Sequence, residues 1–337
     1  PFMFWIQDML PAIREYRGYK LSSWDFPYSI NKSWAEHLPY TNQTFKGRKV
    51  EVLPIGYNIK YFYPKEISSY NYDITFISHL FDPELTLAPI HDPELKFEYD
   101  SSEISLINAN IISNEDLREL YKLILDYLQN LSLNDLTGFV TDVQEYTENM
   151  LRTISSNSMF KIPQEFQLYL INGQDRVFHH VMNEIKKTPI SILKKEGYKV
   201  SVWGNNWHRY KELESISKGI ANNNSEVNDI QNRSKINLNN SGGISLHMKA
   251  IEIIASKSFM LSRKIINDGH SLLDYFDKDE IMFFDDENDL LEKTEYYLKY
   301  SEIRNNISVK AYNKLKSRFS YDKYAITIVN NILKSII

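Results

Sequence analysis

The chain has 337 residues, of which 42% are hydrophobic and 25% charged, ordinary values for a folded protein long enough to build two cores. Its formal net charge of -5 argues against non-specific binding to nucleic acid and against bulk electrostatic attraction to a membrane surface. The absence of cysteine excludes disulfides and thiolate metal sites and fits the cytoplasm, and no apolar run reaches the ~18–20 residues that span a bilayer.

The first 64 residues predict a small α/β unit. Residues 2–6 predict a buried opening strand in a chain that is truncated or renumbered at its start, residues 34–38 predict a helical patch, and residues 49–53 predict a second strand. The stretch 54–64 contains a Pro-Ile-Gly turn and a second proline, which is the composition of a hinge between domains. A plain surface turn is the alternative.

Residues 73–77 predict the first strand of a second domain, and a long helical stretch follows over residues 81–188. Ser113 is placed to cap a helix whose apolar residues recur over 117–128, and residues 166–185 predict further helix, interrupted near Gly173. An insertion of roughly 100 residues is longer than one strand-to-helix connection needs. It either shapes an acceptor site or an oligomer contact, or is packed scaffold.

The remaining pattern alternates strand and helix, as a parallel sheet requires. Residues 198–203 and 236–238 predict strands, residues 244–256 predict a helix with a broad buried face, and residues 259–261 predict the next strand. Ligands of open parallel sheets bind beyond the carboxyl ends of the strands, so the loops after the first two of these strands should line one crevice. The loop residues in question are Gly204 and Asn205, then Ser241, Gly242 and Gly243.

The loop of small residues before helix 244–256 predicts an anion site. Free backbone N–H groups and the helix dipole at such a place favour a phosphate or diphosphate. Lys249 and Glu252 are three residues apart on one helix and share a face, so a cation and a hydrogen-bond acceptor meet the same ligand. Together these features predict a nucleotide site.

Five further residues are candidates, and four of them have a structural alternative. His247 is placed to donate to phosphate or sugar, or to cap the surface. Trp203 stacks on a base or belongs to the core, and Asn267 with Asp268 reaches sugar hydroxyls or only forms a turn. Asp8 follows the first strand and is the candidate base or acceptor-orienting carboxylate.

Three ordered segments carry a family resemblance. Residues 234–239 read Ser-Lys-Ile-Asn-Leu-Asn, residues 248–252 read Met-Lys-Ala-Ile-Glu, and residues 284–290 read Phe-Asp-Asp-Glu-Asn-Asp-Leu. In this order they are similar to the C-terminal half of spore-maturation-type glycosyltransferases, whose C-terminal domain is of the glycosyltransferase group 1 type. The resemblance covers residue 198 to the end well and residues 52–77 more loosely.

The resemblance implies an α/β protein of the GT-B type with two Rossmann-like domains. Residues 1–64 would be a shortened, partial acceptor-side domain with its linker. Residues 65–337 would be the nucleotide-sugar-binding domain, with the helical insertion at about 81–188. The implied activity moves a hexosyl or N-acetylhexosaminyl group from a nucleotide-activated donor, with a UDP-sugar favoured, to a protein, glycan or other acceptor. No cofactor and no metal is required.

The resemblance also assigns roles and exposes two departures. Glu252 would accept hydrogen bonds from the ribose hydroxyls, and Lys249 would face the diphosphate, where the family often has arginine. Many relatives of the same fold have a glutamate where this chain has Ile244, and a basic pair after the first strand of the second domain, where it has Ser78-His79. A non-catalytic nucleotide-sugar-binding or scaffold protein and a sugar-nucleotide epimerase of similar fold are therefore the alternatives.

Overall fold

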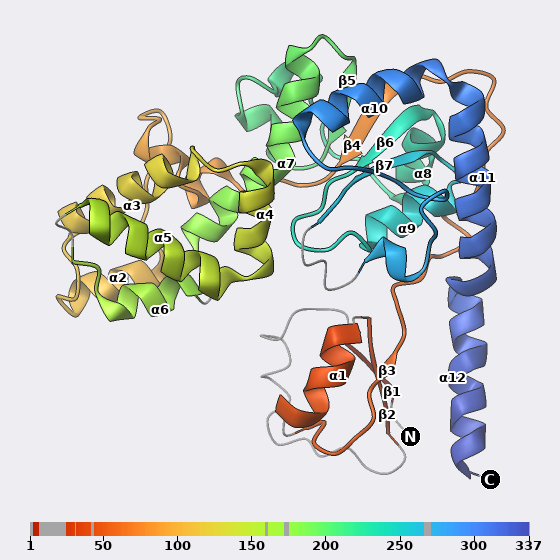
Figure 1. The fold of residues 1–337 in the computed structure, drawn as a ribbon, viewed down its shortest axis with the longest axis horizontal. Coiled ribbons are helices and arrows are strands. Elements are labelled where there is room, and N and C mark those ends of the chain that lie inside the picture. Colours follow the sequence, from red (N-terminus) through yellow and green to blue (C-terminus); the bar gives the residue numbers. More distant parts are fainter. Residues whose placement is uncertain are drawn as a thin grey trace.

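The computed structural model has two α/β units and a helical lobe at the side of the larger one (Figure 1). The small unit contains the start of the chain, and the C-terminal helix runs back beside it. The structure describes residues 3–6, 25–30, 32–41, 44–158, 161–171, 175–265 and 271–336.

Three parallel strands form the first sheet in the order β1-β2-β3: β1 (Met3–Ile6), β2 (Phe26–Ser29) and β3 (Glu51–Val52). Helix α1 (Lys32–Thr41) packs against this unit through Leu38, which belongs to one buried cluster with Phe45 and Val50. Strands β1 and β3 and helix α1 were expected. Strand β2 was not, because Pro27 lies inside it and proline is disfavoured in a central strand.

Five parallel strands form the second sheet in the order β5-β4-β6-β7-β8: β4 (Tyr72–Ile77), β5 (Val200–Trp203), β6 (Ser234–Asn239), β7 (Met260–Arg263) and β8 (Met282–Phe284). The chain builds outward from β4 first to β5 and then, in the other direction, through β6 to β8. Two parallel α/β units confirm the expected fold class. The order also creates a switch point between β4 and β6, where such sheets bind their ligands.

Helices cover both faces of the second sheet: α7 (Arg176–Lys195), α8 (Asn224–Asn232), α9 (Met248–Ala255), α10 (Glu287–Lys299) and α11 (Ser301–Arg318). Residues of α7 and α10 share one core with the sheet, and residues of α9 and α11 form a second core. The strands are therefore buried on both sides, as expected for residues 236–238. In β6, Ile236 and Leu238 belong to the first core, whereas Asn237 and Asn239 are buried polar side chains. Helix α9 begins at Met248, four residues after the expected start, because His247 is its N-cap.

The helical lobe consists of five helices: α2 (Ser101–Asn108), α3 (Asn114–Leu128), α4 (Leu133–Thr141), α5 (Val143–Asn157) and α6 (Gln164–Ile171). Ser113 caps α3 as expected, since its hydroxyl accepts from the Asp116 N–H at 3.0 Å. A buried ion pair between Arg176 and Glu103, at 3.3 Å, ties the start of α7 to the lobe. Helix α7 then continues to β5, so it joins the lobe to the second sheet (Figure 1).

The linker between the sheets lies beside the segment that leads into α12 (Tyr321–Ile336). The Tyr57 N–H donates to the Phe319 carbonyl at 3.0 Å, and the Tyr321 N–H donates back to the Tyr57 carbonyl at 3.4 Å. Helix α12 packs on the first sheet through Tyr324, which belongs to one buried cluster with Tyr28 and Leu53. The chain passes between the two units twice, near Tyr57 and near Phe319, and these two segments form one junction. The domain division after residue 64 stays a prediction.

Candidate functional site

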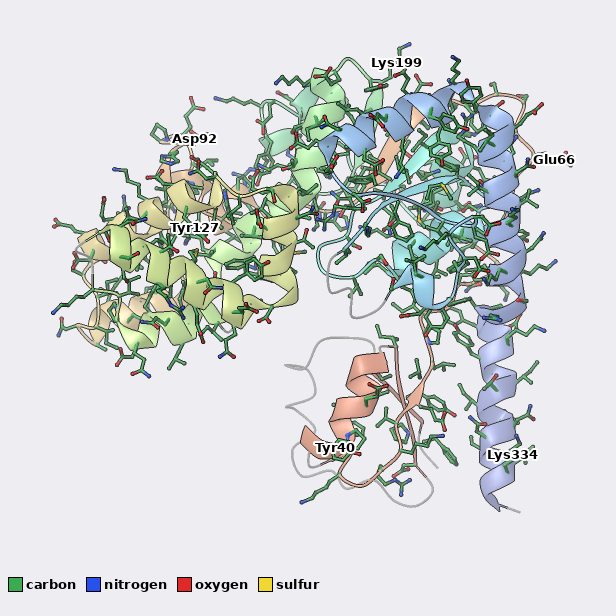
Figure 2. All side chains as sticks on the ribbon, viewed as in Figure 1. Tyr40, Glu66, Asp92, Tyr127, Lys199 and Lys334 are labelled. Atoms are coloured by element: carbon green, nitrogen blue, oxygen red, sulfur yellow. The ribbon has the colours of Figure 1, made fainter. Side chains whose placement is uncertain are left out.

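A cavity of about 240 Å³ lies at the switch point of the second sheet. The ends of β4 and β6 form its floor, the loop after β6 and the start of α9 form one side, and α7 forms the other. Lys199, which directly precedes β5, lies on the side of the sheet away from the small unit, so the carboxyl edge of the strands faces that unit (Figure 2). The polar residues that line the cavity are Thr75, Ser78, Lys186, Gln231, Asn237, Asn239, Asn240, Ser241, His247 and Lys249.

The Gly-Gly loop presents two donors there. Arg263 donates through Nη2 to the carbonyl oxygens of Ser241 and Gly242, at 3.2 and 3.1 Å. In a trans peptide the N–H points opposite to the C=O, so the N–H groups of Gly242 and Gly243 point away from Arg263. Neither N–H makes a hydrogen bond within the described part of the chain. Successive free N–H groups on a loop form an anion-binding concavity.

Two lysines bring positive charge to the same cavity. Burial, together with the charge of the neighbouring Lys249, lowers the pKa of Lys186 to about 8. Burial also lowers the pKa of Lys249 to about 8, although Glu252 opposes this shift. Across the residues that the structure describes, neither ammonium forms an ion pair. The cavity thus has an excess of cationic and donor groups that an anion would satisfy.

His247 is placed to donate a hydrogen bond into the cavity. Burial, together with Lys249 and Lys186, lowers its pKa to about 4, so the ring is neutral at pH 7. Its Nδ1 accepts the N-cap hydrogen bond from the Lys249 N–H at 3.4 Å. The single ring proton is therefore on Nε2, which can donate to a ligand.

Glu252 lies one helical turn beyond Lys249 and does not line the cavity itself. Burial raises the pKa of its carboxyl to about 7, although Lys249 opposes the shift. Burial, and after it the charge of Glu252, raises the pKa of Tyr321 at the start of α12. Glu252 is thus placed between the cavity and the junction of the two units.

Three expected site residues lie beside β4 and not on the cavity, because β4 separates β5 from β6. Trp203 is 5% exposed and packs edge-on against Tyr72, with ring centroids 5.0 Å apart. Gly204 has a φ of +138° and touches the backbone of Ser78. The N–H of Asn205 donates to Nδ1 of His79 at 2.9 Å. The structure does not bring the loop after β5 and the loop after β6 together, and ligand roles for these three residues stay predictions.

The structure brings Ser241, Gly242, Gly243, His247 and Lys249 to one cavity, and their ligand roles stay predictions. Asp8, Asn267 and Asp268 lie outside the described residues.

Lys186 is the functional candidate that sequence reasoning missed. It is one of 39 basic residues, it lies in the helical insertion, and no motif marks it. In the fold its Nζ donates to the His79 carbonyl at 2.8 Å, directly after β4. Lys186 therefore supplies the cation at the place where the resemblance expected a basic pair and the chain has Ser78-His79.

The described residues offer neither a metal cluster nor a membrane-spanning helix. They contain no group of three or more His, Asp or Glu side chains arranged to hold a metal ion. Nor does any helix among them combine the length and hydrophobicity that crossing a membrane requires.

Residues 188–330 match a family model described as "Glycosyl transferase-like". This range includes the Gly-Gly loop and α9 and ends within α12, whereas β4 and Lys186 precede it. No curated protein sequence matches the chain. The closer resemblance to spore-maturation-type proteins stays a prediction.

Several solved structures are similar to the chain at low sequence identity. Sucrose-phosphate synthase from Thermosynechococcus elongatus is 9% identical, with 91% of this chain and 58% of that chain covered and a TM-score of 0.47. A glycosyltransferase from Rickettsia africae is 12% identical, with 99% and 71% covered and a TM-score of 0.47. TarM is 11% identical, with 90% and 43% covered and a TM-score of 0.43. The chain thus spans little more than half of the first protein and less than half of TarM.

Proposed function

We propose that this protein transfers a hexosyl or N-acetylhexosaminyl group from a nucleotide-activated sugar to a protein, glycan or other acceptor. The observation that carries the proposal is the cavity between β4 and β6, where two free backbone N–H groups meet two lysines that lack ion-pair partners in the described chain. It lies at the switch point of a sheet of which four strands, β5 to β8, belong to the glycosyltransferase-like match. The resemblance favours a UDP-sugar, and the lack of cysteine favours a cytoplasmic location.

The chemistry needs negative charge to be stabilised on the departing nucleoside diphosphate. The bond between the anomeric carbon and the phosphate oxygen breaks, an acceptor oxygen forms the new bond, and the acceptor proton goes to a base. Lys186, Lys249 and the Gly242 and Gly243 N–H groups are placed to meet the growing charge on the diphosphate, so we propose that no metal and no other cofactor is required. His247 donates from Nε2 to phosphate or sugar, and Asp8 remains the candidate base.

We further propose that Glu252 accepts hydrogen bonds from the ribose hydroxyls. It follows Lys249 by one turn on the same helix face, so a ribose attached to a diphosphate at Lys249 would extend toward it. Burial disfavours the charged form and raises the pKa of this carboxyl to about 7, so Glu252 is an ionised, strong acceptor only above that pH.

Binding and turnover of nucleotide sugars test this proposal. We expect UDP or another nucleoside diphosphate to raise the melting temperature, because a ligand that binds only the folded state stabilises it. Mass-tagged donor should then give a glycosylated acceptor or, without acceptor, slow hydrolysis to free sugar. If no nucleoside diphosphate at millimolar concentration changes the melting temperature, the proposed function is wrong.

A non-catalytic nucleotide-sugar-binding protein is the second candidate. Ile244 lines the cavity at the position where relatives of the same fold have a glutamate, so one polar contact to the donor is replaced by an apolar one. Such a protein would bind nucleotide sugar without consuming it. Release of epimerised nucleotide sugar would instead indicate the epimerase alternative.

The affinity for UDP should have an optimum between about pH 7 and pH 8. Glu252 becomes an anion as the pH rises through about 7, which strengthens ribose binding. Lys186 and Lys249 lose their charge as the pH rises through about 8, which weakens diphosphate binding. Calorimetry from pH 6 to pH 9 measures both limbs. Pyrophosphate has no ribose, so its affinity should fall at alkaline pH but should not increase as Glu252 ionises. In Glu252→Gln, the increase in UDP affinity near pH 7 should disappear. An unchanged pH profile for UDP in this variant would contradict the ribose assignment.

A further inference from the structure

Arg263, the last residue of β7, connects two parts of the chain that are far apart in sequence. Its side chain is 1% exposed. One arm of the guanidinium, Nη2, holds the carbonyl oxygens of Ser241 and Gly242, at 3.2 and 3.1 Å. The other arm, Nη1, donates to the Thr137 hydroxyl and to the Leu133 carbonyl, the latter at 3.4 Å. Both of these partners belong to α4 in the helical lobe.

The lobe reaches the Gly-Gly loop at further points. A methyl group built on Gly242 would meet the Met182 side chain at 2.5 Å and the Val140 side chain at 3.7 Å, so α7 and α4 both pack against this glycine. Directly before the loop, Nδ2 of Asn240 donates to the Ile185 carbonyl of α7 at 2.7 Å. The loop is therefore held by α4, α7 and Arg263 together.

We propose that Arg263 is a positioning residue that couples the helical lobe to the anion-binding loop, so that the lobe controls the affinity for the donor diphosphate. By holding the Ser241 and Gly242 carbonyls on one side, Arg263 turns the Gly242 and Gly243 N–H groups to the other side. Arginine is suited to this role because its planar fork can bind two pairs of acceptors in fixed directions. The inference rests on the proposed function, since it assigns the insertion a part in the donor site.

Replacing Arg263 with methionine tests this coupling. Arg263→Met keeps most of the apolar stem and removes the guanidinium, so the two peptide groups of the loop are free to rotate. We expect the affinity for pyrophosphate, measured by calorimetry, to fall about tenfold or more, as the loss of two preorganised donors to a charged ligand implies. Thr137→Val should weaken binding by roughly two- to fivefold, because it removes one contact of the lobe with Arg263.

Two further variants separate positioning from simple destabilisation. Arg304→Met removes another buried arginine that donates to backbone carbonyls, those of Tyr297 and Leu298, away from the cavity. It should lower the free energy of unfolding and leave the pyrophosphate affinity within about twofold of the parent protein. Arg263→Lys restores a cation and should recover part of the lost affinity. If Arg263→Met does not fold, Thr137→Val and Arg263→Lys test the same contacts.

The outcomes also distinguish this inference from the proposed function. If Arg263→Met and Thr137→Val bind pyrophosphate as tightly as the parent protein while Lys186→Met does not, the diphosphate site stands and the role of Arg263 is wrong. If the parent protein itself binds neither pyrophosphate nor any nucleoside diphosphate, both proposals fail. An equal loss of affinity in Arg304→Met would reduce Arg263 to a general contributor to stability.

Discussion

Replacing either Lys186 or Lys249 with methionine should lower the affinity for pyrophosphate and nucleoside diphosphate by about tenfold to a hundredfold. A hydrogen bond to a charged group is worth about 1.5–3 kcal/mol, which corresponds to that range of equilibrium constants. Turnover should fall at least as much, because negative charge on the leaving diphosphate is greatest in the transition state. Titration calorimetry and initial rates with a mass-tagged donor measure the two effects.

Lys187→Met is the matched control. Lys187 is the next residue on α7, but its ammonium pairs with Glu184 at 2.6 Å and lies over the Tyr210 ring. Its loss should affect stability and leave diphosphate affinity nearly unchanged. Salt should reduce the difference between the parent protein and the Lys186 and Lys249 variants, since it screens the charge that they lack. Equal affinities in all variants, with folding intact, would mean that the anion site lies elsewhere.

Gly204→Ala should destabilise the protein by about 3 kcal/mol or more, through a forbidden backbone conformation and a steric overlap. Gly204 has a φ of +138°, which side chains rarely permit, and a methyl group there would lie 1.9 Å from the Ser78 carbonyl oxygen. The obstructing atom is backbone at the end of β4, so no rotamer change can relieve the overlap. Urea denaturation measures the loss of stability.

Gly219→Ala is the control for the cost of a positive φ without any steric overlap. Gly219 has a φ of +79°, and nothing lies within 4 Å of the position that its methyl group would take. We expect a cost of about 1–2 kcal/mol, as for other left-handed residues that gain a side chain. If the two alanine variants lost equal stability, the contact of Gly204 with Ser78 would not be the cause.

This contact matters for function as well, because Ser78 lines the candidate site. Trp207 donates from Nε1 to the same Ser78 carbonyl at 2.6 Å, so two groups after β5 fix the end of β4. Gly204 thus supports one wall of the cavity from outside, although it was expected to line it. Gly204 does not reach the cavity because β4 lies between β5 and β6: β5 pairs with the edge of β4 that is opposite to β6.

The sequence by itself determined the features that depend on neighbours along the chain. The strands near residues 73–77, 198–203 and 259–261 follow from runs of apolar residues, and the start of α3 follows from the Ser113 cap. The adjacency of Gly242, Gly243 and Lys249 also follows from local order, because a loop and the helix after it meet without any long-range contact.

Only the tertiary structure decided which distant parts complete the site. Strand order depends on pairing between segments more than a hundred residues apart, so no local pattern could show that β4 separates Gly204 from Gly242. The positions of Lys186 and Arg263 at the site also depend on tertiary packing. Helix α7 brings the first from the insertion, and the guanidinium of the second is buried between α4 and the loop after β6. One cation of the site, Lys186, therefore comes from a helix that the sequence pattern identified only as part of an insertion. Its burial and its proximity to the loop arise only when the chain is packed.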